Sequence, residues 1–96
     1  MQLYMIRRRS AWADQEELEK TAAISGRVGK EEMADKLRWI RSYVINKPDG
    51  RLGAGCIYEA VDGEAISEHA RRVGIPGGDF LPNAATVVVR PDPEAP

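Results

Sequence analysis

The chain has 96 residues, of which 30% are charged and 43% hydrophobic, a composition typical of one small globular domain. Its 14 basic and 15 acidic side chains leave a net charge of −1, which gives no overall attraction toward nucleic acid or anionic lipid. The single cysteine and single histidine exclude an internal disulfide, a multi-cysteine zinc site and a two-histidine metal motif within one chain.

The N-terminal segment predicts a strand followed by a helix. Residues 2–9 alternate in the manner of a half-buried strand. One face of this strand would carry Leu3, Met5 and Arg7, and the other would carry Tyr4, Ile6 and Arg8. Asp14 and Glu17 form a capping box, which predicts a main helix over about residues 14–28 and a further turn over residues 30–34.

The middle of the chain predicts a β-hairpin. Residues 36–46 form the most apolar strand, residues 47–50 predict a turn with the sequence Lys-Pro-Asp-Gly, and residues 52–60 return as a strand. On the first strand, strict alternation would place Leu37, Trp39, Tyr43 and Ile45 on one face and Ile40, Ser42 and Val44 on the other. On the second strand, Gly53 and Gly55 would leave space for a bulky neighbour such as Trp39.

The C-terminal third predicts a second helix and a last strand. Asp62 caps this helix, Gly74 follows its last turn, and Pro76 comes shortly after. Its apolar stripe consists of Ile66, His69, Ala70 and Val73. A strand over residues 81–90, strongest at residues 86–89, is expected to close the domain.

The element order β-α-β-β-α-β is that of the ferredoxin-like fold, an α+β arrangement with a four-stranded antiparallel sheet and both helices on one face. We therefore expect a single ferredoxin-like domain over residues 1–90 and a disordered proline-rich tail over residues 91–96. The central strands carry apolar side chains on both faces, and a monomer exposing such a patch is unusual. This pattern predicts a homodimer formed through the helix-free sheet face.

Targeting and nucleic-acid signals are weak throughout the sequence. Residues 1–9 place apolar side chains before three arginines, the reverse of a secretory signal, and no apolar run approaches the roughly 18 residues of a membrane span. The aromatic platform motif of RNA-binding modules with this fold is missing. We expect a soluble cytoplasmic protein that contacts neither membrane nor nucleic acid and whose Cys56 is reduced.

His69 is the first candidate for a functional site, because it lies on the helix stripe that faces the sheet. One interpretation is a core histidine bonded to a strand carbonyl or a tyrosine hydroxyl. The other is a ligand or proton-transfer group in a pocket between helix and sheet. Cys56 and Tyr58 share the face opposite the glycines and would reach the same region if that face is the one turned toward the helices. Cys56 also has the simpler interpretation of a small buried hydrophobe.

Other polar groups have ordinary structural interpretations. We expect Glu59 to be solvated or to pair with Arg41 across the hairpin rather than to act in catalysis. We expect Tyr43 to be a packed aromatic with a bonded hydroxyl rather than a general acid. The arginines at positions 7–9 cannot share one strand face, so a solvated strand end is expected there.

Over about residues 37–76 the chain resembles a family of small bacterial nickel-binding-protein-like sequences of largely unknown function. The resemblance rests on Ser-Tyr-Val at residues 42–44, Cys-x-Tyr at residues 56–58 and His-Ala at residues 69–70, in this order. It implies a dimeric α/β protein with a ferredoxin-like fold. The positions that match the family pattern are Ser42, Tyr43, Cys56, Tyr58, Glu59 and His69.

The resemblance also implies nickel as a candidate cofactor. It points to His69 and Cys56 as the metal ligands, because imidazole and thiolate suit nickel. One histidine and one cysteine per chain are a sparse donor set. A tight site would therefore need both subunits, or surface carboxylates such as Glu64 and Glu68.

Three functions stay open at the level of sequence. The first is a small non-enzymatic dimer that binds a metal ion or a small molecule. The second is a cofactor-free enzyme of the dimeric α/β-barrel type, an oxygenase or isomerase, in which His69 or Tyr58 acts as acid or base. The third is a structural interaction module whose polar core residues only specify packing. No nucleotide-binding or hydrolase motif identifies a substrate.

Overall fold

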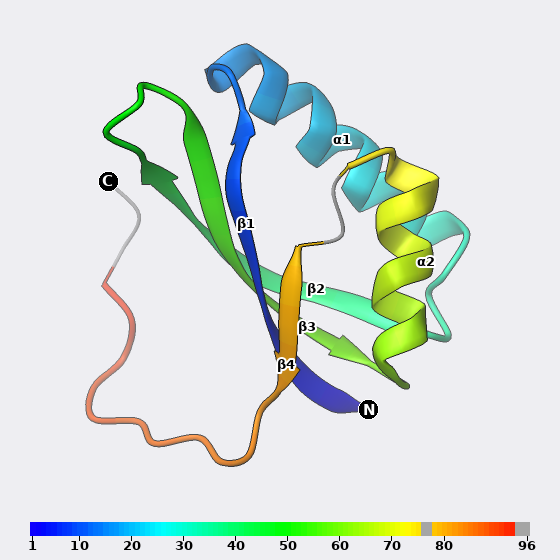
Figure 1. The fold of residues 1–96 in the computed structure, drawn as a ribbon. Helices are drawn as coiled ribbons and strands as arrows, with labels where there is room; N and C mark the ends of the chain where they lie inside the picture. The colour runs from blue at the N-terminus through cyan, green and yellow to red at the C-terminus, as the bar shows by residue number, and fades with distance from the viewer. Residues whose placement is uncertain (76–77, 94–96) are drawn as a thin grey trace.

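The computed structural model describes residues 1–75 and 78–93, and its elements follow the order expected from the sequence (Figure 1). They are β1 (Gln2–Trp12), α1 (Gln15–Glu31), β2 (Leu37–Asn46), β3 (Leu52–Ala60), α2 (Gly63–Val73) and β4 (Asp79–Pro82). The strands pair antiparallel in the order β2-β3-β1-β4, and both helices cover one face of the sheet. This arrangement confirms the predicted ferredoxin-like fold.

Local hydrogen bonds fix the ends of both helices. The Asp14 carboxylate accepts from the backbone N–H of Glu17 at 2.9 Å, and Asp62 accepts from that of Ala65 at 2.9 Å. Gly74 ends α2 in the left-handed conformation with φ of 86°, a geometry that favours glycine. These caps are the ones that the sequence predicts.

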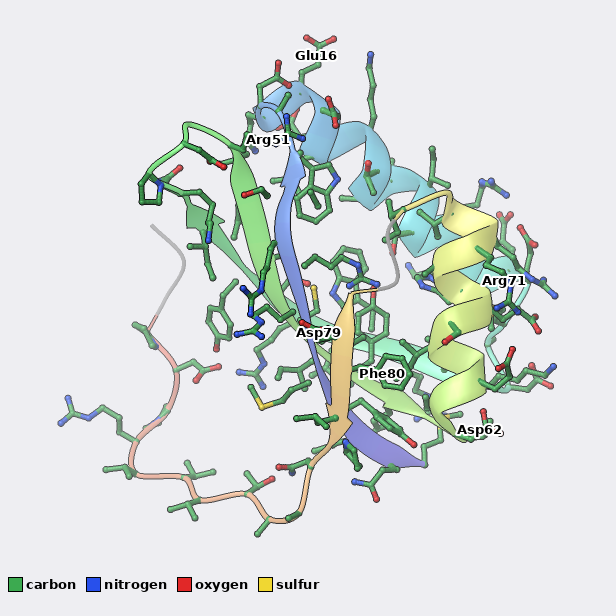
Figure 2. All side chains as sticks on the ribbon, viewed as in Figure 1. Glu16, Arg51, Asp62, Arg71, Asp79 and Phe80 are labelled. Carbon is green, nitrogen blue, oxygen red and sulfur yellow. The ribbon has the colours of Figure 1, made fainter. Side chains whose placement is uncertain are left out.

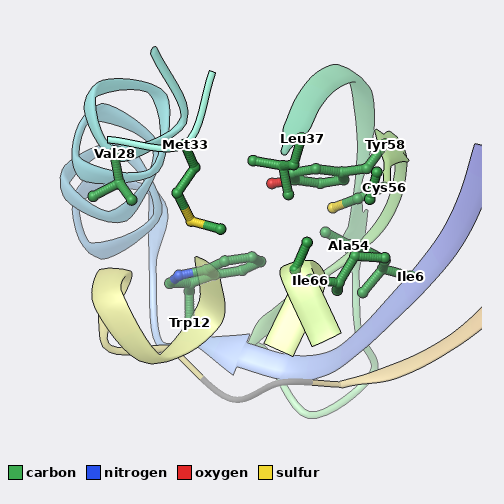
Figure 3. Packing of buried hydrophobic residues seen from close by; sticks show 11 residues of the cluster. Ile6, Trp12, Val28, Met33, Leu37, Ala54, Cys56, Tyr58 and Ile66 are labelled. Carbon is green, nitrogen blue, oxygen red and sulfur yellow. The ribbon is translucent and has the colours of Figure 1, made fainter. Parts of the chain in front are cut away.

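The core lies between the helices and the sheet (Figure 3). Its most deeply buried large side chains are Ile6, Met33, Leu37, Ile66, His69 and Val28. The outward sides of the helices carry charged side chains such as Glu16 and Arg71 (Figure 2). α1 continues to Glu31, three residues past the predicted end of the main helix and into the further turn predicted over residues 30–34. In the part of the chain that the structure describes, no helix is long and apolar enough to cross a membrane.

β2 contains an irregularity at its centre. Trp39 lies opposite Tyr58 on β3, whereas Arg41 lies opposite Ile57, the next residue along. Two residues on β2 therefore correspond to one step on β3, which makes Ile40 the extra residue of a β-bulge. The alternation of faces is interrupted at this point.

The bulge redistributes the side chains of β2 between the two faces. On the helix side it places Leu37, Trp39, Ser42 and Val44, and on the open side Arg41, Tyr43 and Ile45. The predicted common face of Leu37, Trp39, Tyr43 and Ile45 is therefore wrong, because strict alternation does not survive an inserted residue. Trp39 packs against Tyr58 and not over Gly53 and Gly55.

The last strand is shorter and begins earlier than the predicted strand over residues 81–90. β4 pairs with β1 up to Pro82, and the Asn83 N–H donates to the Leu3 carbonyl at 2.8 Å. Because β1 begins at Gln2, the chain beyond Asn83 has almost no β1 backbone left to pair with. Residues 86–89 therefore lie outside the sheet, and the prediction of a strand there is wrong.

The segment after β4 returns to the open side of the sheet, which has no helix (Figure 1). Asp92 accepts a hydrogen bond from Tyr43 Oη at 3.0 Å and forms an ion pair with Arg41. Between these contacts and β4, Val87, Val88 and Val89 are 74–86% exposed. The predicted tail extends to residues 94–96, which lie outside the described residues, as does Pro76.

Candidate functional site

A cavity of about 440 Å³ opens between α1 and the helix side of β2 and β3. Its apolar lining includes Trp12, Leu18, Ala22, Trp39, Val44 and Ala54. Its buried or half-buried polar lining consists of Arg8, Thr21, Ser25, Ser42, Cys56 and Tyr58. The cavity therefore combines apolar walls with a few polar side chains, as small-molecule sites generally do.

Arg8 is the buried cation of this cavity. Its side chain projects from β1 on the helix side and is 3% exposed, and its Nη1 donates to Cys56 Sγ at 3.6 Å. The expectation of a solvated strand end at residues 7–9 is therefore wrong for Arg8. It holds for Arg7, an exposed side chain 3.4 Å from Asp79. The alternation of β1 already placed Arg8 with apolar neighbours, which was the available signal.

Cys56 lies at the centre of a short chain of hydrogen bonds. Trp39 Nε1 donates to Ser42 Oγ at 2.8 Å, and Ser42 Oγ donates to Cys56 Sγ at 2.9 Å. The bulge at Ile40 makes this possible, because it puts Ser42 directly opposite Cys56 on the helix side. Cys56 is buried, as expected, but its sulfur accepts hydrogen bonds from two sides and is more than a small hydrophobe.

Tyr58 and His69 pack against each other beside the cavity. Their rings meet edge to face with centroids 5.6 Å apart, and Tyr58 lies next to Cys56 on β3 (Figure 3). The oxygen atoms of the Tyr58 and Ser25 hydroxyls are 3.4 Å apart. Burial raises the pKa of Tyr58, although the hydrogen bond with Ser25 acts in the opposite direction. Tyr58 therefore presents a protonated hydroxyl at neutral pH.

His69 is 1% exposed and bonds to α1 rather than to a strand. Its Nε2 donates to the Ser25 carbonyl at 3.2 Å, and this nitrogen must carry the proton because a carbonyl oxygen can only accept. Burial lowers the pKa of His69, against the effect of the Ser25 hydrogen bond and with the help of the Arg8 charge. His69 also lines a second hollow of about 430 Å³, on the side of Trp39 where Gly29 and Leu37 lie.

Two of the predicted site residues lie on the other sheet face. Tyr43 is 51% exposed there and donates its hydroxyl to Asp92. The Glu59 carboxylate lies 4.0 Å from the guanidinium of Arg38, because the register places Arg38 opposite Glu59. The expected pair between Glu59 and Arg41 is wrong, since Arg41 pairs with Asp92.

The six predicted site residues therefore divide into three groups. Ser42, Cys56 and Tyr58 line one cavity, His69 touches Tyr58 from the adjoining core, and Tyr43 and Glu59 are separated from them by the sheet. Arg8 also belongs to the first group, although the sequence pattern did not single it out as a site residue.

The donor chemistry does not fit a nickel ion held by one chain. Over residues 1–75 and 78–93, no three or more His, Cys, Asp and Glu side chains are grouped so that they could hold a metal. The Nε2 atom of His69 is already bonded to Ser25, and the Arg8 guanidinium beside Cys56 repels a divalent cation. His69 and Cys56 would need further ligands from outside these residues.

Comparisons with known proteins give a consistent picture of the fold. Residues 4–79 match the family described as nickel responsive protein SCO4226-like. The crystal structure of SCO4226 from Streptomyces coelicolor A3(2) is similar, with a TM-score of 0.68 and 15% identity over 88% of this chain and 99% of that chain. At this identity the likeness shows the fold alone. A search of curated proteins found no significant match. Because the family match covers most of its length, the chain belongs to the nickel responsive protein SCO4226-like family.

Proposed function

We propose that this protein is a non-enzymatic homodimer that binds a small molecule in the cavity between α1 and the sheet. The observation that carries this proposal is the convergence of Arg8, Ser42, Cys56 and Tyr58 on one partly apolar cavity of about 440 Å³. Ligand sites of roughly 300–1,000 Å³ with apolar walls and a few polar groups are the usual form of small-molecule pockets.

The hydrogen bonds around Cys56 favour binding over catalysis. One common way to activate a nucleophilic thiol is a general base within hydrogen-bond reach. The groups that bond to Cys56 Sγ are the hydroxyl of Ser42 and the guanidinium of Arg8, and neither takes up a proton at neutral pH. His69 is committed to the Ser25 carbonyl. These contacts give the enzyme alternative no support in the part of the chain that the structure describes.

Tryptophan fluorescence and thiol labelling can both report binding of a ligand in this cavity. Both of its tryptophans, Trp12 and Trp39, line the cavity, and so does its single cysteine, Cys56. Titration with phenylacetate, phenylacetamide and phenethylamine is followed by tryptophan fluorescence and by the rate at which a small thiol reagent labels Cys56. We expect at least one of the three probes to change the fluorescence saturably and to slow the labelling.

A pair of neighbouring alanines supplies the control. Ala22 lines the cavity, whereas Ala23 is an exposed residue of the same helix that does not line it. Ala22→Phe should fill part of the cavity and weaken probe binding at least about tenfold, since overfilled sites exclude ligands. Ala23→Phe should bind as the natural sequence does. Absence of binding for all three probes, or equal binding by both variants, would contradict the proposal.

The family description makes nickel the natural competing ligand, and it has its own test. We expect titration with a nickel salt to give binding weaker than about 1 mM. We also expect His69→Ala and Cys56→Ala to leave that weak binding unchanged, because the Arg8 charge and the Ser25 hydrogen bond oppose metal coordination at these atoms. Micromolar binding lost in either variant would instead support the predicted metal ligands.

The homodimer part of the proposal rests on the open sheet face. This face exposes several large apolar side chains, namely Met5, Tyr43, Ile45 and Leu81. Their burial between two copies, related by a two-fold axis, would remove the patch from water. We also propose that the protein acts in the cytoplasm, where a lone buried thiol such as Cys56 stays reduced.

A further inference from the structure

We propose that the segment after β4 of one chain adds as a strand to the outer edge of β2 in a second copy of the chain. This segment, residues 83–93, is called the C-terminal arm below. The inference rests on the proposed homodimer and names the parts of the two chains that pair. Within residues 1–75 and 78–93, it is carried by an apolar run that forms no strand and a strand edge that has no neighbour.

The C-terminal arm contains four β-branched residues in succession, Thr-Val-Val-Val at residues 86–89, and such residues favour strands. Val87, Val88 and Val89 are 74–86% exposed and lie outside the sheet of their own chain. A strand in which consecutive side chains are apolar, rather than alternate ones, is typical of a strand covered on both faces. The run therefore has the sequence of a buried strand without the position of one.

The outer edge of β2 offers such a position. In the order β2-β3-β1-β4, the described part of the chain gives β2 a neighbour on one side, β3, and none on the other. After the bulge at Ile40, the pairing of residues 41–46 with β3 is regular. On this stretch Tyr43 and Ile45 on the open side, and Val44 on the helix side, are each about half exposed. A free edge with apolar side chains on both faces pairs readily with a further strand.

The contacts that hold the C-terminal arm on its own chain are weak. Asp92 accepts a hydrogen bond from Tyr43 and pairs with Arg41. Both side chains of this ion pair are about half exposed, and exposed ion pairs contribute little to stability. Between the arm and the open side of the sheet lies a hollow of about 570 Å³, lined by Met5 and by residues 85–90. Moving the arm to a second copy therefore costs its own chain little packing.

A pair of proline variants tests the pairing. In a strand with one neighbour, the backbone N–H groups of successive residues point alternately toward that neighbour and away from it. Proline removes the N–H group, so Val87→Pro and Val88→Pro should differ although the chemical change is the same. We expect one of them to raise the dissociation constant of the dimer at least about tenfold more than the other, because it leaves a carbonyl of the partner unpaired. Sedimentation equilibrium measures both constants.

Hydrogen exchange on the natural sequence gives a second readout that needs no variant. The amides of residues 86–89 should exchange more slowly at concentrations where the dimer is populated than after dilution to the single chain. A dimer in which these amides exchange equally fast at both concentrations would overturn the pairing of the arm. So would proline variants that weaken the dimer equally or not at all. These results would leave a homodimer formed through the open sheet face intact, whereas a chain that is monomeric at all concentrations would remove both.

Discussion

His69 illustrates how burial determines the behaviour of a single side chain. It is the only histidine of the chain and the only side chain whose ordinary pKa lies between pH 5 and 8. Burial lowers its pKa in the folded state, and the Arg8 charge acts in the same direction. The unfolded chain therefore binds a proton at a higher pH than the folded chain does. The stability that the neutral form of His69 contributes is fully present above the unfolded pKa of about 6.5, and it is lost progressively as the pH falls below this value.

This linkage predicts the pH dependence of unfolding. Between about pH 7.5 and 5.5, the free energy of unfolding should fall with decreasing pH, with a slope of at most one proton, or about 1.4 kcal/mol per pH unit. Urea unfolding followed by circular dichroism across this range measures the slope. His69→Gln keeps a donor for the Ser25 carbonyl but does not titrate, so the slope should become flat. A flat profile for the natural sequence would contradict the lowered pKa.

At the scale of elements, α2 begins and ends as its sequence predicts, whereas β2 does not follow its simple pattern. Asp62 and Gly74 act through bonds to backbone groups a few residues away, so they function wherever the helix is placed. The bulge at Ile40 instead depends on how β2 pairs with β3. It positions Ser42 beside Cys56 and Trp39 against Tyr58, and so builds one wall of the cavity.

Two helix glycines should respond to alanine with opposite signs. Gly74 has φ of 86°, so Gly74→Ala forces a left-handed conformation on a residue with a Cβ and should cost about 1 kcal/mol. Gly26 lies within α1 with nothing within 4 Å of an added Cβ, so Gly26→Ala should stabilise the fold by about 0.5–1 kcal/mol. Urea unfolding of both variants measures the difference. A destabilised Gly26→Ala or a stabilised Gly74→Ala would contradict the local geometry.

At the scale of the whole molecule, the two faces of the sheet differ sharply. One face is covered by α1 and α2 and contains the core and the cavity. Within residues 1–75 and 78–93, the other is met by the segment that follows β4, which contacts it through Asp92 and leaves Tyr43 and Ile45 about half exposed. The proposed dimer follows from this asymmetry.

The open face gives a prediction for the oligomeric state. Light scattering should report twice the mass of one chain for the natural sequence. Ile45→Lys places a charge in the proposed interface and should shift the mass toward one chain, because a buried unpaired charge is strongly unfavourable. Ile24→Lys, at a site of similar exposure on α1, should remain dimeric. A natural sequence that is monomeric at all concentrations would rule out the interface.

The sequence by itself determined the element order, the helix caps, the hairpin turn, the common strand face of Cys56 and Tyr58, and the position of His69 on the apolar stripe of its helix. These features depend on short-range signals: a capping carboxylate, a turn glycine, and the alternation or helical spacing of apolar residues. The family pattern likewise placed Ser42, Cys56 and Tyr58 in one set, and the structure brings these three together at one cavity.

Only the tertiary structure decided which side chains share that cavity and which do not. Arg8 is buried because β1 pairs with β3 and turns that side chain under the helices, although its neighbours in sequence are exposed. Tyr43 lies on the opposite face because one inserted residue in β2 reverses the alternation. Residues 86–89 have high strand propensity yet form no strand. They run past the first residue of β1, Gln2, and so find no β1 backbone to pair with. In each case the outcome depends on strand register, which joins residues far apart in the chain and is not encoded by the local pattern of either strand.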